Sequence, residues 1–196
     1  MLTKEQFLEP LARYRTDEVV ITTMGVVRPW SEHSDSDLDF ASADSAMGHA
    51  ADLALGVAMA QPYRKVICLN GDGSMLMSLG TLVTIVESGV ENLLLFVVVN
   101  HSYEITGNQP IPGAGSVDFC AMAKAAGFRR RYDIQDAEDY QGRLEEILAA
   151  DGPVFVSVRV APGEEGPISR SDGESARYLR TSLADWSRKF RQALSP

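Results

Sequence analysis

The sequence predicts a doubly wound α/β fold, with a mostly parallel sheet covered by helices on both faces. Apolar runs of strand length alternate with segments of helical periodicity along the chain, and such alternation is typical of parallel sheets. Two of the runs, at 65–70 and 92–99, are rich in Val, Ile and Leu, as expected of strands that are buried on both faces. A chain of 196 residues, 45% hydrophobic, is long enough to form one such domain with a substantial core.

The order of the predicted elements follows from these patterns. Strands are expected at 18–23, 38–42, 65–70, 92–99, 128–134 and 153–160. Helices are expected at 3–14, 47–59, 74–87, 117–126 and 137–150. Pro10 should bend or shorten the first helix, because proline removes a hydrogen bond and clashes with the preceding turn. Gly127 should end the fourth, as glycine commonly does beyond a helix C-terminus. Residues 26–37 have no periodicity and are interpreted as a loop at the functional rim.

The carboxyl-terminal part of the chain has a different pattern. Residues 161–173 are rich in Pro and Gly without apolar periodicity, which predicts a mobile arm. Residues 174–194 return to helical patterning and carry more apolar surface than a free tail should expose. We therefore expect an α/β domain over 1–160, and an arm and helix over 161–196 that pack on this domain or on a partner chain.

Composition excludes several classes of function. The net charge of −9 and the pI near 4.8 argue against nucleic acid, which is bound by clustered Lys and Arg; the short cluster 129–131 is interpreted as a solvated strand edge. Cys68 and Cys120 have no CxxC partner, so we do not expect disulfides or metal–sulfur sites. We therefore expect the protein in a reducing cytoplasm. No apolar stretch reaches the roughly 18 residues of a membrane span, and the amino terminus lacks a signal-peptide pattern.

Polar residues follow two of the predicted strands. Gly71-Asp72-Gly73-Ser74 ends the run at 65–70, and Asn100 ends the run at 92–99. Parallel strands that are joined by one crossover helix bring their carboxyl ends together, so Asp72 and Asn100 should face one crevice. A carboxylate and an amide oxygen suit a hard divalent cation, which in turn neutralises a diphosphate. A tight turn at GDG and a helix cap at Asn100 are the alternatives that these residues leave open.

With these residues, 17–160 resembles the cofactor-binding domain of thiamine diphosphate (ThDP) enzymes, whose signature is GDG followed by Asn after the next strand. The stretch 45–48 (SAMG) is similar to the family segment whose bulky apolar residue props the cofactor in a bent shape. The stretch 103–110 (YEITGNQP) is similar to the small subunits and carboxyl-terminal domains of sulfopyruvate and phosphonopyruvate decarboxylases.

The resemblance implies a role for each site residue. Mg²⁺ would be held by Asp72, Asn100 and the backbone carbonyl of Ser102. The cofactor would be contacted by Thr22, Thr23, Ser45, Met47, Gly71, Gly73, Ser74, Asn100, Tyr103 and Ile105. Met47 would be the prop, the alternative being a core methionine. His101, beside a metal ligand, and His33, in the rim loop, are candidates for proton transfer or substrate contact.

The resemblance also implies a partner chain. ThDP enzymes of this class take an activating Glu from a separate pyrimidine-binding domain, which this chain is too short to include. Where pyruvate-decarboxylase-like enzymes have a further Glu, Thr106 stands here. We therefore expect one subunit of a split ThDP- and Mg²⁺-dependent 2-oxoacid decarboxylase, forming a heterotetramer or larger assembly and releasing CO₂ and an aldehyde. Arg28, Arg170 or residues of the partner chain would bind a second anionic group of the small 2-oxoacid substrate.

Three other functions stay open at this point. An acetolactate-synthase-like carboligase half would accept a second carbonyl compound in place of the proton. A non-catalytic ThDP-binding subunit would hold the cofactor without turnover, and a plain nucleotide-binding α/β module would share only the phosphate-binding geometry.

Overall fold

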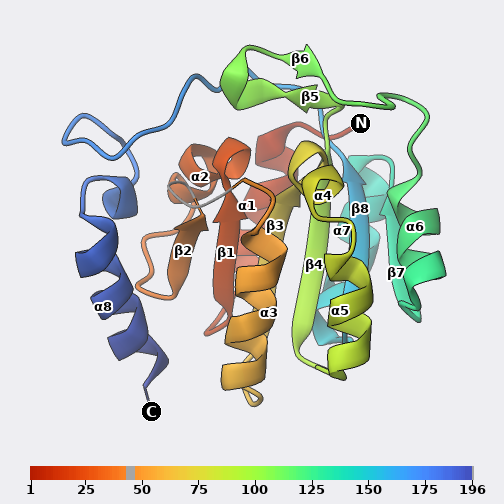
Figure 1. Cartoon of the computed structure of the whole chain (residues 1–196), viewed down its shortest axis with the longest axis horizontal. Helices are drawn as coiled ribbons and strands as arrows, with labels where there is room; N and C mark the ends of the chain where they lie inside the picture. The colour runs from red at the N-terminus through yellow and green to blue at the C-terminus, as the bar shows by residue number, and fades with distance from the viewer. Residues whose placement is uncertain (43–46, 196) are drawn as a thin grey trace.

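A six-stranded parallel sheet forms the centre of the computed structural model, which describes residues 1–42 and 47–195. Its strand order is β2-β1-β3-β4-β8-β7 (Figure 1). The strands are β1 (Val19–Thr23), β2 (Asp39–Ser42), β3 (Val66–Gly71), β4 (Leu93–Val99), β7 (Arg130–Ile134) and β8 (Val154–Arg159). The chain leaves β1 toward one edge and later returns on its other side at β3, so a topological switch point lies between β1 and β3. Open α/β sheets bind ligands at such points.

Helices cover both faces of the sheet, as expected from the alternating pattern. In Figure 1 the front face carries α3 (Ala50–Ala60), α5 (Thr81–Ser88) and α6 (Phe119–Ala126). The opposite face carries α1 (Lys4–Tyr14), α2 (Met24–Ser31) and α7 (Ala137–Ala149). The predicted doubly wound α/β fold is therefore confirmed.

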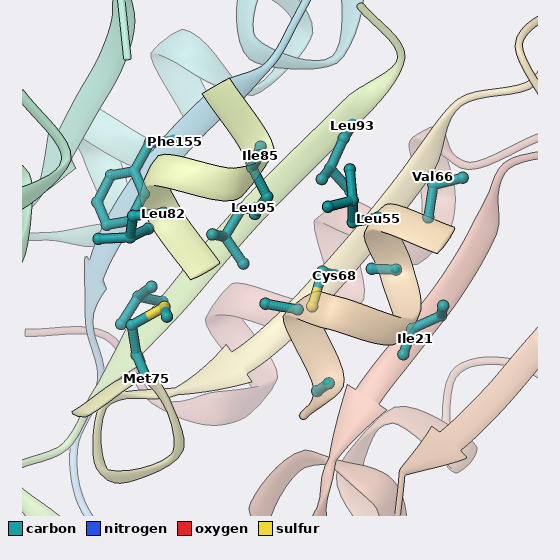
Figure 2. Close-up of a cluster of buried hydrophobic side chains, with 14 of the residues drawn as sticks. Ile21, Leu55, Val66, Cys68, Met75, Leu82, Ile85, Leu93, Leu95 and Phe155 are labelled. Carbon is teal, nitrogen blue, oxygen red and sulfur yellow. The ribbon is translucent and has the colours of Figure 1, made fainter. Parts of the chain in front are cut away.

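Strand β4 shows how one apolar run supplies both cores. Alternate residues of a strand point to opposite faces, so Leu93 and Leu95 join the cluster under α3 and α5, while Leu94 and Phe96 join the cluster under α1 and α7. Figure 2 shows the first cluster, in which Cys68 and Leu95 from the strands meet Leu55, Leu82 and Ile85 from the helices. All residues of β4 are buried.

Pro10 does not shorten the predicted first helix, and part of the predicted loop at 26–37 is helical. Pro10 lies inside α1, which still runs to Tyr14, because Phe7, Leu8 and Leu11 are buried and hold the helix against the sheet despite one missing backbone bond. The predicted loop at 26–37 begins as helix α2. Val26, Val27 and Trp30 are its buried residues, and their spacing is too short a helical pattern to recognise from the sequence.

The predicted crossover helix at 74–87 is two helices, α4 (Asp72–Met77) and α5. Between them, the hydroxyl of Ser78 donates to the carbonyl of Gly48. A Cβ on Gly48, whose φ is +90°, would lie 2.8 Å from Cβ of Met77. The break therefore accommodates the segment before α3, which begins at Ala50 and not at Met47. Gly48 consequently lies against α4.

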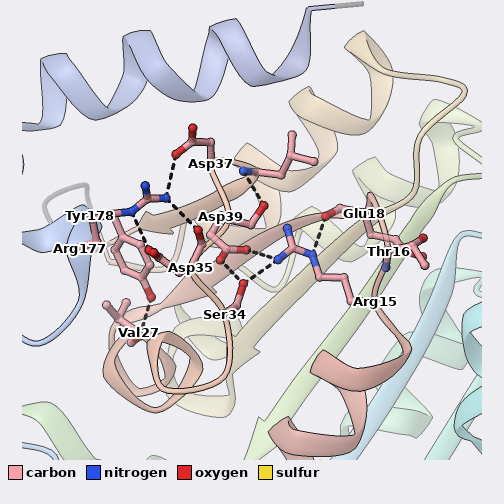
Figure 3. A network of polar contacts seen from close by, with 12 residues as sticks. Arg15, Thr16, Glu18, Val27, Ser34, Asp35, Asp37, Asp39, Arg177 and Tyr178 are labelled. Carbon is pink, nitrogen blue, oxygen red and sulfur yellow. Dashed lines mark hydrogen bonds and ion pairs between the residues drawn. The ribbon is translucent and has the colours of Figure 1, made fainter.

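The carboxyl-terminal segment crosses the top of the sheet and descends beside β2 as α8 (Leu183–Leu194), preceded by the short helix η2 (Arg177–Leu179) (Figure 1). The indole N–H of Trp186 donates to the carbonyl of Asp39 at 2.9 Å. The hydroxyl of Tyr178 donates to the carbonyl of Val27 at 2.6 Å (Figure 3). Both bonds are buried, so this segment is packed on the edge of the sheet.

A buried ion pair supports the same edge. Arg15 and Asp39 lie 2.9 Å apart, with only 6% and 1% of their side chains exposed (Figure 3). Burial raises the pKa of the Asp39 carboxyl, and Arg15 and the hydroxyl of Ser34 oppose that rise. Both Cys68 and Cys120 are free thiols. Within residues 1–42 and 47–195, no helix has the length and apolar character needed to cross a bilayer.

Candidate functional site

A cavity opens at the carboxyl ends of β1, β3 and β4, at the topological switch point of the sheet. It encloses about 790 Å³ of space, including the solvent at its open mouth. Its lining includes Lys4, Thr23, Met24, Gly25, Val26, Ser42, Met47, Gly48, Ala50, Gly71, Asp72, Gly73, Ser74, Met77, Val98, Asn100, Ser102, Tyr103, Glu104, Ile105 and Thr106. The residues after β3 and after β4 therefore meet in one cavity, as their places at neighbouring strand ends predict.

Asp72 lies at the floor of the cavity and is 1% exposed. One carboxylate oxygen accepts the backbone N–H of His101 at 2.7 Å, and the other accepts the N–H of Gly73 at 2.7 Å. Burial raises the pKa of the Asp72 carboxyl, and these two donors oppose the rise. A cation bound to the carboxylate would offset the same desolvation, so the site favours a positive ion.

Asn100 follows β4, beside the end of β3. Its Oδ1 accepts the N–H of Ser102 at 3.0 Å, and its Nδ2 donates to Glu104 Oε2 at 2.9 Å. A carbonyl oxygen has two lone pairs, so Oδ1 retains one for a further ligand.

Ser102 belongs to β5 (Ser102–Tyr103), which pairs with β6 (Gln109–Pro110) above the sheet. Its partner across this pair is Pro110, and the neighbouring bond runs from the N–H of Ile111 to the carbonyl of His101, so the Ser102 carbonyl points away from β6. The pairing therefore suits a carbonyl that binds a metal.

Gly73 is required at its position by the ring of Tyr103. A Cβ at residue 73 would lie 2.4 Å from Cε1 of that ring, so any larger residue would displace the tyrosine. Ser74 follows at the start of α4, where N–H groups have no partner within the helix. Its hydroxyl is buried and unpaired within the described part of the chain, which leaves a donor available to a ligand in the cavity.

Eight of the ten predicted cofactor residues line the cavity. Met47 is 58% exposed and lines the cavity beside Met77, so it is not a core methionine. Thr23 and Ile105 also line it, whereas Thr22 does not. Thr22 is buried, and its hydroxyl has no hydrogen-bond partner among the described residues. Ser45 falls outside the described residues.

The two candidate histidines do not line the cavity. His101 has a φ of +60°, and its Nδ1 accepts the N–H of Gly115 at 3.3 Å. Its backbone N–H reaches the site, at Asp72. His33 lies in the turn that follows α2. A role for either imidazole in proton transfer stays a prediction without support from the cavity geometry.

The proposed cations for a second anionic group are engaged elsewhere. Arg28 donates to both carboxylate oxygens of Glu174, at 2.7 and 2.8 Å, and to the carbonyls of Gly166 and Pro167. Arg170 donates to two carbonyl oxygens near η2. Neither arginine lines the cavity. Both instead hold the carboxyl-terminal segment.

Sequence reasoning missed two charged residues of the site. Lys4 and Glu104 line the cavity and form an ion pair with 2.6 Å between Nζ and Oε1. Glu104 stands four residues after Asn100, which was a usable signal. Lys4 gave none, because its nearness to the site depends on how α1 crosses the sheet.

The oxygen atoms of the site do not form a complete metal centre by themselves. Among the described residues, no group of three or more His, Cys, Asp or Glu is placed to hold a metal ion. One carboxylate, one amide and one carbonyl are too few for Mg²⁺ alone, which commonly completes its six ligands with phosphate oxygens and water. The set fits a metal that arrives with a phosphorylated ligand.

Comparison with known proteins decides which ligand this is. Residues 22–158 match the family described as thiamine pyrophosphate enzyme, C-terminal TPP binding domain. The chain belongs to this family. Thiamine pyrophosphate is the same compound as thiamine diphosphate, so the resemblance that the GDG and Asn100 motifs indicate is confirmed.

Relatives within this thiamine diphosphate enzyme family include two decarboxylases. Sulfopyruvate decarboxylase subunit beta of Methanothermobacter thermautotrophicus is 37% identical over 176 residues, which cover 89% of this chain and 91% of that protein. Phosphonopyruvate decarboxylase of Streptomyces viridochromogenes is 35% identical over 174 residues, covering 87% of this chain and 43% of that protein.

A solved structure agrees on the fold of this ThDP-binding domain. The thiamine diphosphate-dependent 4-hydroxybenzoylformate decarboxylase of Rhodococcus jostii RHA1 superposes with a TM-score of 0.67 at 22% identity, covering 84% of this chain and 33% of that chain. The α/β architecture around the cavity is therefore that of ThDP-dependent enzymes.

Proposed function

We propose that the chain is the cofactor-binding subunit of a ThDP- and Mg²⁺-dependent 2-oxoacid decarboxylase that acts on sulfopyruvate or phosphonopyruvate. The observation that carries the proposal is the meeting of Asp72, Asn100 and Ser102 at one cavity. Ser74 also lines this cavity, and its buried hydroxyl has no partner among the described residues. The two decarboxylase relatives match most of this chain, and they supply the substrate class.

The residues of the site divide the binding work between them. Asp72, Asn100 and the Ser102 carbonyl would hold Mg²⁺, and Mg²⁺ would hold the diphosphate. Ser74 and the N–H groups at the start of α4 would bind diphosphate oxygens directly. Met47, exposed at the cavity, would support the cofactor in its bent shape. When bound, the cofactor supplies the electron sink that accepts the electrons of the C–C bond as CO₂ leaves.

The same proposal includes a partner subunit. Asp72 and Glu104 are the carboxylates among the described lining residues, and both already accept hydrogen bonds inside this chain. A free carboxylate that could activate the aminopyrimidine would therefore come from a second polypeptide. The relatives whose name is subunit beta support a partner subunit. A heterotetramer or larger assembly is part of the proposal. Free Cys68 and Cys120 suit a reducing cytoplasm.

The products distinguish the proposal from a carboligase and from a non-catalytic subunit. The complex of this chain with its partner, supplied with ThDP and Mg²⁺, should convert sulfopyruvate or phosphonopyruvate to CO₂ and an aldehyde in equal amounts. A carboligase would release CO₂ and yield a condensed hydroxy-keto product in place of the aldehyde. A non-catalytic subunit would bind ThDP without releasing CO₂.

A further inference from the structure

A buried carboxylate lies beside Asn100, one of the residues proposed to hold the metal. Glu104 is 5% exposed and begins the short helix η1 (Glu104–Thr106). Its Oε2 accepts Nδ2 of Asn100 at 2.9 Å. Its Oε1 accepts a hydrogen bond from Nζ of Lys4 at 2.6 Å and from the N–H of Glu165 at 3.2 Å.

We propose that Glu104 is a positioning residue, which orients the amide of Asn100 so that its oxygen faces the metal. The inference rests on the proposed function, since it assigns a role at the same site.

The hydrogen bonds of Asn100 fix the direction of its amide. An ionised carboxylate can only accept, so the NH₂ group of Asn100 must face Glu104. The backbone N–H of Ser102 can only donate, so Oδ1 must face Ser102. Without Glu104, rotation of the amide by half a turn would cost only the Ser102 bond. The rotated amide would present NH₂ to the metal, which is a donor and not a ligand.

Glu104 is itself held by α1 and by the segment that crosses the top of the sheet. Lys4 comes from the first turn of α1, 14% of its side chain is exposed, and it balances the buried charge of Glu104. Glu165 reaches Glu104 from the segment that crosses the top of the sheet. A Cβ on Gly163 of that segment would lie 2.3 Å from Glu104 Oε1 and 3.0 Å from Lys4 Nζ. The backbone therefore closes over the ion pair, and hydrogen bonds that are enclosed in this way are stronger than exposed ones.

A purely structural role for Glu104 is the competing explanation. An ion pair between α1 and η1 could serve only to join two elements, and its loss would then lower stability without changing metal affinity. The two roles differ in what responds to a substitution. Partners that orient metal ligands typically contribute about 10- to 100-fold to metal affinity.

The test is a calorimetric titration. The chain is assembled with its partner, saturated with ThDP and titrated with Mg²⁺. Glu104→Gln keeps the size of the side chain and should weaken Mg²⁺ affinity by about 10-fold or more, since the Gln amide no longer requires the NH₂ of Asn100 to face it. Glu104→Ala should weaken it at least as much. Glu145→Gln removes the same charge at an exposed position on α7 and should leave the affinity unchanged. The melting temperature of each cofactor-free variant reports any effect on folding separately.

The outcomes separate this inference from the proposed function. Wild-type affinity for Mg²⁺ in both Glu104 variants would overturn the positioning role, whatever their melting temperatures. Failure of the wild-type complex to bind ThDP in an Mg²⁺-dependent way would overturn the proposed function, and the positioning role with it. Lys4→Met provides a further contrast. It should lower the melting temperature but weaken Mg²⁺ binding less than Glu104→Ala, because Glu104 still accepts from Asn100.

Discussion

The backbone N–H of His101 donates to the carboxylate of Asp72 at 2.7 Å, and this bond joins the segment after β4 to the end of β3. It places the residue that follows Asn100 directly over Asp72. The two metal ligands of the proposed site are thus held in position by the backbone before any ion binds, and preformed sites lose less entropy on binding.

The first prediction concerns Asp72. Asp72→Ala should abolish Mg²⁺-dependent ThDP binding, because it removes the buried carboxylate that would neutralise the ion. Calorimetry of the assembled complex with ThDP, with and without Mg²⁺, measures the effect. Asp172→Ala, at an exposed position, is the matched control and should bind normally. Unchanged ThDP affinity in Asp72→Ala would show that the metal assignment is wrong.

Met47 offers a test that separates cofactor geometry from stability. Met47 is 58% exposed, so Met47→Ala should change the free energy of unfolding by no more than about 0.5 kcal/mol. A buried methionine would instead cost about 2–5 kcal/mol. If the side chain supports the bent cofactor, Met47→Ala should lower kcat, while Met47→Leu should be mild. Met59→Ala, which is 60% exposed on α3, should alter neither quantity. Normal kcat in Met47→Ala would refute the prop.

A third expectation follows from the missing carboxylate. The isolated chain should not decarboxylate sulfopyruvate, phosphonopyruvate or pyruvate, because the described lining residues offer no free carboxylate to activate the cofactor. The measurement is CO₂ release by the pure chain with ThDP and Mg²⁺, after verification that no second polypeptide is present. Turnover under those conditions would rule out the two-chain arrangement.

The ion pair of Arg15 and Asp39 predicts both a stability change and its dependence on pH. Arg15→Ala leaves the Asp39 carboxylate buried without its partner and should cost about 3–5 kcal/mol of unfolding free energy at pH 7. Arg13→Ala is the control. Arg13 pairs with Glu9 at the surface, 74% exposed, and such pairs contribute about 1 kcal/mol or less.

The direction of the pH effect follows from the raised pKa of Asp39. Burial makes the folded state bind the Asp39 proton more tightly than the unfolded state, whose Asp pKa is about 3.9. Relative to wild type, the Arg15→Ala variant should therefore recover stability as the pH falls through the raised pKa, with the gain complete below about 3.9. Urea unfolding of both proteins across this range measures it. A deficit that grows on acidification would contradict the buried-charge explanation.

Most of the fold could be predicted from the sequence, because strands that are buried on both faces produce apolar runs that are hard to mistake. The breaks in helices could not. The division of the crossover into α4 and α5 depends on how Gly48 and Met77 pack, which is a contact between segments distant in sequence. Helix α2 is similar, since only Val26, Val27 and Trp30 mark it as helical and Pro29 argues against it.

The meeting of Asp72 and Asn100 in one cavity was predictable, because the end of each strand fixes the place of the residue that follows it. Asp72 and Asn100 each follow an apolar run directly, so topology alone brings them together. The sequence did not show that Arg28 lies away from the cavity, because no strand end fixes the position of its side chain. Its side chain reaches Glu174 in a segment 146 positions away in the chain, and no local pattern indicates that contact. Lys4 was missed on the same grounds.

Decarboxylation by the assembled complex tests the central claim most directly. The chain and its partner would be assayed for CO₂ and aldehyde from sulfopyruvate and from phosphonopyruvate, with ThDP and Mg²⁺ present together, each omitted in turn, and with Asp72→Ala in place of the wild-type chain. We expect equal amounts of CO₂ and aldehyde from at least one of these substrates only when both ThDP and Mg²⁺ are present, and none from Asp72→Ala. Absence of CO₂ release from both substrates in a complex that binds ThDP and Mg²⁺, or undiminished release by Asp72→Ala, would contradict the proposed function.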